Sequence, residues 1–594
     1  MSAILRQTWD LETLFPGGSD SGKLAATARA VEEDLRALTE PSGWRTPSAG
    51  GQEALAARIT ALQSVYARLE EASSFVGCLL AQDVEDQKAK IWNGRVSELG
   101  ALAATALSYL EQRLAELGDG EWERLLSEPG MREVSFALAE TRTRAREKMP
   151  LEKEILVNDL SVDGYHAWSD MYDTVVGRMK IAVTKDGETR ELSVGQADNA
   201  LQDADRTYRA HAFEQWEGAW AREAELCAGI LNHIAGFRLQ VYGARGWRSV
   251  LKEPLEYNRM TEATLTAMWD AVLRNKERLV PYLQRKAKLF GVDRLDWHDV
   301  EAPLGETGRK FSYEEARAFI VRHFRAFSGD LAEFSDRCFE RAWIEAEDRP
   351  GKRPGGFCTR FPVSGETRIF LTFSGQPGNV ATVAHELGHA YHQFVMEGMP
   401  YFAQNYPMNV AETASTLGEM IVADAALRSA AGTAERAALL DDKLQRAVAF
   451  FMNIHARFLF ETEFYERRRQ GLVSAEELNA LMQSAQERAF AGALGAYHPH
   501  FWASKLHFYI TGAPFYNFPY TFGYLFSAGV YARALQAGPE FAGRYVQLLR
   551  ETGGATVEEL ALRHLDADLT GADFWQAAAD LILADVGEFM RATE

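Results

Sequence analysis

The amino-acid sequence predicts a mainly α-helical protein. Apolar residues recur at helical spacing along most of the chain, and short breaks containing Gly, Pro or Asp separate these stretches. Alternating patterns typical of strands are few and local. The helical pattern extends over 20–40, 52–72, 85–118, 196–240 and 262–290.

A longer helix is expected from about Leu439 to Gln470. Leu444, Val448 and Phe451 follow one another at intervals of four and three, with charged residues between the apolar positions of the stretch. Gly471 stands where a helix commonly ends.

Strands are expected in two places. Residues 179–194 form two short runs around Asp186-Gly187, which is a strong hairpin signal. The second candidate covers 356–374 and includes a strand over Arg368–Phe373. We divide the chain into an N-terminal helical domain, 1–200, with the hairpin near 179–194, and a C-terminal domain, 201–594, which holds the candidate catalytic and metal-binding residues described below.

Composition and charge restrict the class of protein. The chain has 594 residues, with 64 Lys and Arg against 84 Asp and Glu, so its formal net charge is −20. Nucleic-acid binding and attachment to anionic lipid both need a basic surface, so we expect no partner of either kind. No apolar run is long enough to span a membrane.

The four cysteines are Cys78, Cys227, Cys338 and Cys358, and none of them forms a close pair. This spacing suggests neither a disulfide framework nor a thiolate metal site. Scattered thiols fit a reducing compartment, and the N-terminal residues lack the pattern of a signal peptide. We therefore expect a cytoplasmic protein.

Residues 385–389 read His-Glu-Leu-Gly-His within an expected helix that begins near Asn379. On a helix, positions four apart lie one turn apart on the same side, so His385 and His389 aim at one point and suit two ligands of a zinc ion. Glu386 is offset around the axis, which places its carboxylate beside such a metal as a general base. A plain helix with two core histidines is the alternative.

A catalytic zinc site needs a third protein ligand. His392 lies too far along the helix to join both histidines, so it fits a supporting or core role. Residues 409–427 form a further expected helix, which carries Glu412 and Glu419 two turns apart. We expect Glu412 to be the third ligand and Glu419 to support a metal-binding histidine.

The C-terminal segment 507–524, HFYITGAPFYNFPYTFGY, is rich in aromatic residues. His507, Tyr509, Tyr516, Tyr520 and Tyr524 are all candidates for donating a hydrogen bond to the oxyanion of a tetrahedral intermediate. An aromatic core segment explains the same pattern equally well.

Four motifs together resemble those of the oligoendopeptidase F-type members of the thimet oligopeptidase family of zinc metallopeptidases. They are TWDLETLFP near residues 8–16, HELGH at 385–389, VAETAST at 410–416, and HFY with FYNFPY within 507–520. The resemblance implies that Glu412 is the third ligand of one Zn²⁺ per chain. It also implies that His507, Tyr516 and Tyr520 contact substrate and stabilise the intermediate, while spacing leaves the identity of the oxyanion Tyr open.

The resemblance further implies a large helical fold of two lobes enclosing a deep channel, with a small β-sheet beside the zinc-binding helix. Such a channel would admit only short, unstructured oligopeptides. The strand Arg368–Phe373 would bind an extended substrate by β-addition, with Gly355 and Gly356 allowing close approach.

The sequence thus predicts a zinc-dependent endopeptidase of oligopeptides. Two alternatives stay open: a peptidyl exopeptidase of the carboxypeptidase or dipeptidyl carboxypeptidase type, and a non-catalytic peptide-binding protein with structural zinc. The same ligands also accept cobalt or manganese. Cleavage preference and oligomeric state are not encoded in these motifs.

Overall fold

The computed structural model describes residues 5–44, 51–305 and 310–594, and it is mainly α-helical with two small sheets, as predicted. The chain forms two compact units, each assembled from separate stretches. The first unit comprises Met1–Lys148, Arg309–Val422 and Arg533–Asp566, and the second comprises Met149–Gly308, Ala423–Ala532 and Ala567–Glu594. The predicted division of the chain at residue 200 stays a prediction.

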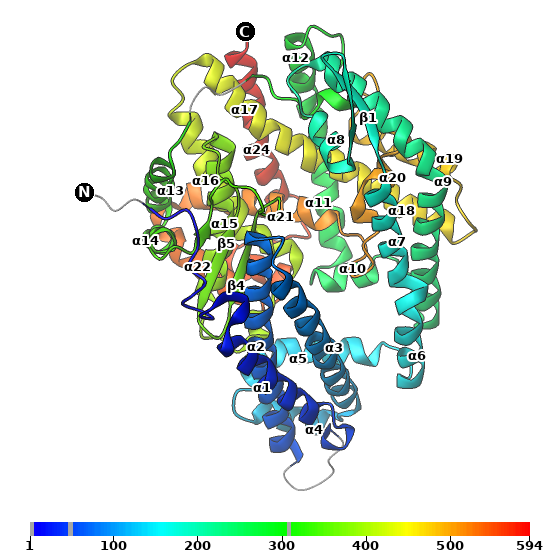
Figure 1. Cartoon of the computed structure of the whole chain (residues 1–594), viewed down its shortest axis with the longest axis vertical. Coiled ribbons are helices and arrows are strands. Elements are labelled where there is room, and N and C mark those ends of the chain that lie inside the picture. The colour runs from blue at the N-terminus through cyan, green and yellow to red at the C-terminus, as the bar shows by residue number, and fades with distance from the viewer. Residues whose placement is uncertain (1–4, 45–50, 306–309) are drawn as a thin grey trace. The chain divides into compact units, whose positions relative to one another are not determined.

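The helices of the first unit include the N-terminal group α1 to α5 and the helices around the HELGH motif (Figure 1). Their bounds are α1 Gly22–Leu38, α2 Gly51–Gln82, α3 Gln87–Glu116, α4 Asp119–Ser127, α5 Ser135–Arg146, α13 Tyr313–Phe327, α14 Gly329–Glu340, α15 Pro377–Val395, α16 Met408–Arg428, α22 Phe541–Glu551 and α23 Val557–Leu565. Helix α16 continues into the second unit.

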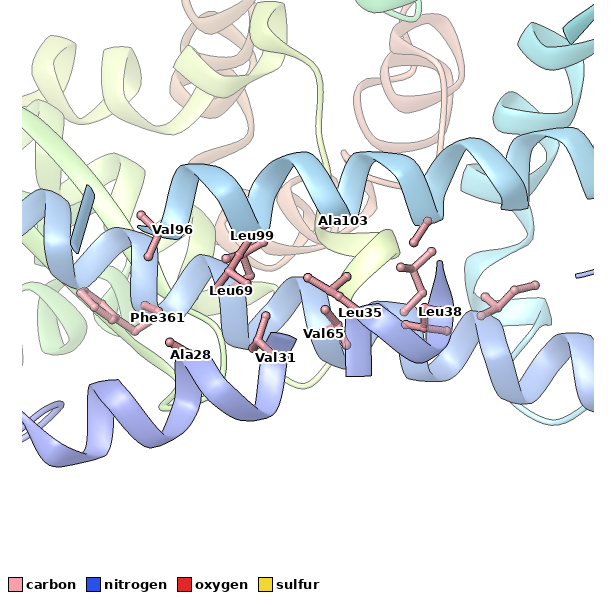
Figure 2. Packing of buried hydrophobic residues seen from close by; sticks show 14 of the residues in the cluster. Ala28, Val31, Leu35, Leu38, Val65, Leu69, Val96, Leu99, Ala103 and Phe361 are labelled. Carbon is pink, nitrogen blue, oxygen red and sulfur yellow. The ribbon is translucent and has the colours of Figure 1, made fainter. Parts of the chain in front are cut away.

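The core of this unit forms where α1, α2 and α3 pack together (Figure 2). Helix α1 begins at a Ser21 side chain that accepts a hydrogen bond from the Leu24 amide, and its buried residues recur every three or four positions. Val31 and Leu35 of this stripe meet Leu69 and Leu99 in the cluster, which Phe361 of the sheet also joins. The helical bundle therefore supports the sheet on which the motif helix packs.

The sheet of the first unit has the order β3-β5-β4, where β3 is Ile344–Glu345, β4 is Phe357–Phe361 and β5 is Glu366–Phe370. Strand β5 pairs antiparallel with β4 and parallel with β3. Because β5 is the central strand, both of its edges are already paired at Ile369 and Phe370, so the expected β-addition of substrate is wrong for that part of Arg368–Phe373 and stays a prediction for Leu371–Phe373. Strand β4 is the antiparallel edge strand instead.

The N-terminal motif TWDLETLFP is tied to this sheet. The buried Arg368 guanidinium donates to the Asp10 carbonyl at 2.8 Å and to the Thr13 hydroxyl at 3.1 Å. The Trp9 amide donates to the Glu345 carboxylate at 3.2 Å, and its indole N–H donates to Gln82 at 2.6 Å. These contacts give the motif a structural role, which is to fasten the chain's start to the sheet beside α15.

The second unit consists mostly of helices. Their bounds are α6 Leu151–Ser161, α7 Ala167–Arg178, α8 Val194–Ala200, α9 Arg206–Ala244, α10 Lys252–Tyr257, α11 Glu262–Asn275, α12 Val280–Leu289, α17 Thr433–Val448, α18 Ile454–Arg468, α19 Ala475–Ala489, α20 Phe501–Ser504, α21 Phe518–Ala537 and α24 Asp573–Ala592. Helix α21 continues into the first unit.

Two sequence expectations concern this unit. An antiparallel hairpin is present, with β1 at Ile181–Lys185 and β2 at Glu188–Leu192, and its turn places Asp186 and Gly187 at positive φ. The helix expected over 439–470 is not a single regular α-helix, because a π-helical turn at Ala449–Asn453 separates α17 from α18. Among the described residues, no helix combines the length and apolar composition that a membrane span requires.

Candidate metal centre

The helix that carries the HELGH motif, α15, starts earlier than the sequence suggested. Its N-cap is Gln376, Pro377 takes the first position, and Asn379 is the third helical residue rather than the cap. The Asn379 side chain accepts hydrogen bonds from the Gln376 amide at 3.2 Å and from the Ser374 amide at 2.9 Å. Asn379 therefore still fixes the start of the helix, as the reciprocal member of a capping box.

Two glycines allow α15 and α16 to approach closely. A Cβ atom on Gly388 would lie 2.3 Å from the Ala414 carbonyl oxygen, and one on Gly418 would lie 2.8 Å from the Ala384 carbonyl oxygen. Each glycine thus faces the backbone of the opposite helix, where any side chain would collide. The contact brings Glu412, two residues before Ala414, against the histidine face of α15.

His385, His389 and Glu412 form one group whose candidate ligand atoms all lie within 4.8 Å of one another. Glu412 Oε2 lies 3.4 Å from His385 Nε2 and 3.6 Å from His389 Nε2. All three side chains are partly buried, with 19–27% of their surface exposed. Two imidazoles and a carboxylate with partial solvent access match the donor set of a zinc site that keeps a position open, so these residues fit the metal.

Glu419 lies behind His385. Its Oε2 is 3.3 Å from His385 Nδ1, so the imidazole can donate its Nδ1–H to this carboxylate and leave the Nε2 lone pair directed toward Glu412 Oε2. Burial lowers the pKa of His389 below its usual value, which favours the neutral form that a metal ligand requires. The structure therefore places Glu412 and Glu419 where the spacing predicted, and their roles stay proposals.

Glu386 is buried, with 6% of its surface exposed. Its Oε2 atom is sealed from solvent and makes no hydrogen bond among the described residues. Burial, and then the Glu412 charge, raise the pKa of Glu386 to about 7, although His385 acts in the opposite direction. Gly356, just before β4, leaves room beside this carboxylate, since a Cβ there would come within 3.4 Å of Oε1.

His392 lies outside this group, as expected, and is a core histidine. It is fully buried, its ring stacks on Tyr406 at 4.1 Å, and its Nε2 contacts the Thr552 hydroxyl at 2.8 Å. Burial lowers the pKa of His392 to about 3, so the ring is neutral.

In the second unit, the rings of His507, Tyr516 and Tyr520 form a triangle with centroids 5.6–6.0 Å apart. The other two aromatic candidates belong to the core: Tyr509 stacks on Tyr172 at 3.8 Å, and Tyr524 stacks on Phe450 at 4.3 Å.

His507 is neutral at physiological pH, because burial and then two nearby cations lower its pKa to about 4. Its Nδ1 atom is sealed and has no hydrogen-bond partner among the described residues. A sealed donor without an acceptor is more costly than a sealed acceptor, so the ring proton belongs on Nε2, where it can be donated.

Buried polar side chains hold the aromatic segment in place. Arg238 donates to the Ile510 carbonyl at 2.7 Å and to the Tyr465 hydroxyl at 2.8 Å. Glu461 accepts a hydrogen bond from the Phe515 amide at 3.2 Å. The backbone of Phe515 has a positive φ of 52°. Sequence reasoning missed these supports, and buried charged residues within apolar helical stretches are the only signal that they left.

A second group with metal-binding residue types, Asp296, His298 and Asp299, is found among the described residues. Arg206 and Arg209 pair with Asp299 at 2.9 Å and 3.0 Å. Two guanidinium groups already neutralise these carboxylates, so this cluster is an ion-pair network that joins α9 to the turn at 297–299.

The chain belongs to peptidase family M3. The family model described as "Peptidase family M3" matches residues 199–581, and the model described as "Oligopeptidase F" matches residues 113–181. The sequence resemblance to oligoendopeptidase F-type members is thereby confirmed.

Similar proteins have been described from several bacteria. Group B oligopeptidase PepB of Streptococcus agalactiae is 24% identical over 96% of this chain and 94% of its own, and the plasmid-encoded oligoendopeptidase F of Lactococcus lactis subsp. cremoris is 23% identical over 99% and 97%. The crystal structure of oligoendopeptidase-F from Enterococcus faecium has a TM-score of 0.70 at 17% identity, covering 96% of this chain and 99% of that one. This last likeness concerns the fold.

Proposed function

We propose that this peptidase is a zinc-dependent endopeptidase that hydrolyses short, unstructured oligopeptides. The observation that carries the proposal is the His385–His389–Glu412 group with Glu386 buried beside it. A closed structural zinc site would use four protein ligands, often cysteines, and would have no use for a buried, unpartnered carboxylate at this position. The names of the relatives, oligopeptidase and oligoendopeptidase, support the choice of substrate.

His385, His389 and Glu412 would hold the zinc ion, and Glu419 would orient His385. When bound, zinc supplies Lewis acidity, which polarises a carbonyl oxygen and makes water acidic enough to ionise near neutral pH. Cobalt or manganese would suit the same donors.

Glu386 is assigned as the general base. Its unpartnered Oε2 would accept a proton from the attacking water, and the same carboxyl group would then donate it to the leaving amine. Gly356 supports this role because it leaves the space beside the carboxylate free for a peptide backbone.

His507 and one of Tyr516 or Tyr520 are assigned to the oxyanion. A neutral His507 with its proton on Nε2 is a hydrogen-bond donor, as is a Tyr hydroxyl, and donors aimed at the developing charge stabilise the intermediate. Which of the two tyrosines contributes is left open.

The test is cleavage of an internally quenched peptide of about ten residues that is blocked at both ends, a length suited to extended binding. We expect internal cleavage that a chelator abolishes and added zinc restores, with the fragments identified by mass. Cleavage that persists in the chelator would overturn the metal dependence.

The exopeptidase alternative predicts a different outcome in the same assay. Blocked peptides would then stay intact while peptides with free ends are shortened. Zinc binding without turnover of either peptide would favour the binding-protein alternative.

All four cysteines carry free thiols, which supports our assignment to the reducing cytoplasm.

A further inference from the structure

Two cationic side chains of the second unit, Arg457 and Lys505, lie against the same aromatic ring without a carboxylate partner. The Arg457 guanidinium lies 5.1 Å from the Phe501 ring centre and the Lys505 ammonium lies 5.7 Å from it. Among the described residues, no carboxylate comes within 4.0 Å of either cation. Glu301 and Asp198 act on them only from farther away.

Other buried cations of this unit are satisfied by protein groups, either by carboxylates or, as for Arg238, by the Tyr465 hydroxyl and the Ile510 carbonyl. Arg209 and Lys286 are also buried cations, and each pairs with a carboxylate, Asp299 at 3.0 Å and Asp441 at 3.1 Å. Removing a cation from water costs free energy that an opposite charge normally offsets. Arg457 and Lys505 thus form a partly desolvated positive site that no carboxylate of the described residues neutralises.

Arg457 is held so that one nitrogen stays available. Its Nε donates to Asn453 Oδ1 at 2.9 Å and its Nη1 donates to Asn517 Oδ1 at 3.0 Å. Nη2 has no hydrogen-bond partner among the described residues and is not sealed from solvent. Lys505 is half-buried and has no hydrogen-bond acceptor for its ammonium group among these residues.

The free cations border the residues assigned to substrate. The charges of Arg457 and Lys505 both lower the pKa of His507, after burial, and Arg457 also interacts electrostatically with Tyr520. Asn517, which positions Arg457, lies in the chain between Tyr516 and Tyr520. An anion bound here would therefore belong to a molecule that also reaches His507 and Tyr520.

We propose that Arg457 and Lys505 form a clamp for a carboxylate of the bound peptide, and that this carboxylate is the peptide's own C-terminus. A guanidinium and an ammonium group together offer the hydrogen bonds that a carboxylate accepts. The clamp rests on the proposed function, and it adds that cleavage is favoured at a set distance from a free C-terminus.

The experiment compares peptides of one sequence that carry either a free or an amidated C-terminus. The parent protein should favour the free form about tenfold or more in KM, as expected for hydrogen bonds to a charged group. Lys505→Gln should reduce this preference to about one, while Lys288→Gln, which removes an exposed cation of the same unit, should keep it. A third peptide, amidated but ending in Asp, separates a side-chain carboxylate from the C-terminal one.

Arg457→Gln is the second variant. Because it also loses hydrogen bonds to Asn453 and Asn517, its melting temperature is measured and compared with that of Lys505→Gln. Equal KM values for free and amidated peptides on the parent protein, or an unchanged preference in Lys505→Gln, would overturn the clamp and leave the proposed function intact. Rescue by the Asp-ended amide would overturn the assignment to the C-terminus. If no peptide is cleaved, the proposed function fails, and tighter equilibrium binding of the free form, lost in Lys505→Gln, would still support the clamp.

Discussion

Replacing Gly388 by Ala should damage the candidate metal centre without touching a ligand. The added Cβ would lie 2.3 Å from the Ala414 carbonyl oxygen and 2.6 Å from the Ser415 Cα, both of them backbone atoms that cannot rotate away. Ordinary contact begins at 3.4 Å, so α15 and α16 must separate by about 1 Å. Glu412 moves with α16.

The size of this displacement decides the outcome. A metal site tolerates deviations of about 0.2 Å in its ligand distances, so a shift of about 1 Å should weaken zinc binding at least tenfold. Overpacking of this kind also costs about 1–3 kcal/mol of stability. If zinc-dependent peptidase activity is the function, turnover should fall by about 10²-fold, as misplacement by about 1 Å does elsewhere.

The assay is zinc affinity, measured by competition with a chelator, together with the melting temperature of the metal-free protein. Gly378→Ala is the matched control, because Gly378 lies on the same helix and a Cβ there meets nothing within 4 Å. Gly388→Ala protein that binds zinc and melts as the parent does would refute the close contact between the two helices.

Two further predictions concern supporting residues. Glu419→Gln should weaken zinc binding about ten- to hundredfold with little effect on metal-free stability, because it removes the carboxylate behind His385, and chelator competition against the exposed Glu397→Gln control measures this. In the second unit, Glu217 is partly buried and pairs with His498 and, at 2.6 Å, with His500. Although burial opposes ionisation, the two histidines lower the pKa of Glu217 to about 2. A lowered carboxyl pKa stabilises the fold above the unfolded value of 4.5, by about 3 kcal/mol, and this contribution disappears as the pH falls from 4.5 toward 2. Glu217→Gln should therefore melt well below the parent at pH 7, and the difference should shrink over that acidic range; an equal difference at every pH would contradict the assignment.

The helical periodicity of the sequence was sufficient to predict the class of fold and the local geometry of the motif. His385 and His389 face one way because four residues make about one turn, and that geometry needs no tertiary information. Glu412 was predicted from the short connection between two helices. The glycine contacts that bring it to the histidines could not be predicted, because they depend on which backbone faces Gly388.

Other features escaped prediction for related reasons. The expected strand Arg368–Phe373 begins at Glu366 in the structure. The central strand can contain the buried Arg368 because its guanidinium group donates a hydrogen bond to the Asp10 carbonyl. The π-helical turn at Ala449–Asn453 interrupts an unbroken apolar pattern, and there the Thr521 hydroxyl donates to the Phe450 carbonyl at 2.9 Å. Both depend on partners far away in the sequence, which periodicity does not reveal.

The most direct test of the account is the metal content and turnover of Glu386→Gln. Because Glu386 is assigned as base and not as ligand, the variant should bind one zinc ion per chain as the parent does, while turnover of the quenched peptide falls by about 10²–10⁴-fold. Turnover comparable to that of the parent, at full zinc occupancy, would contradict the proposed mechanism.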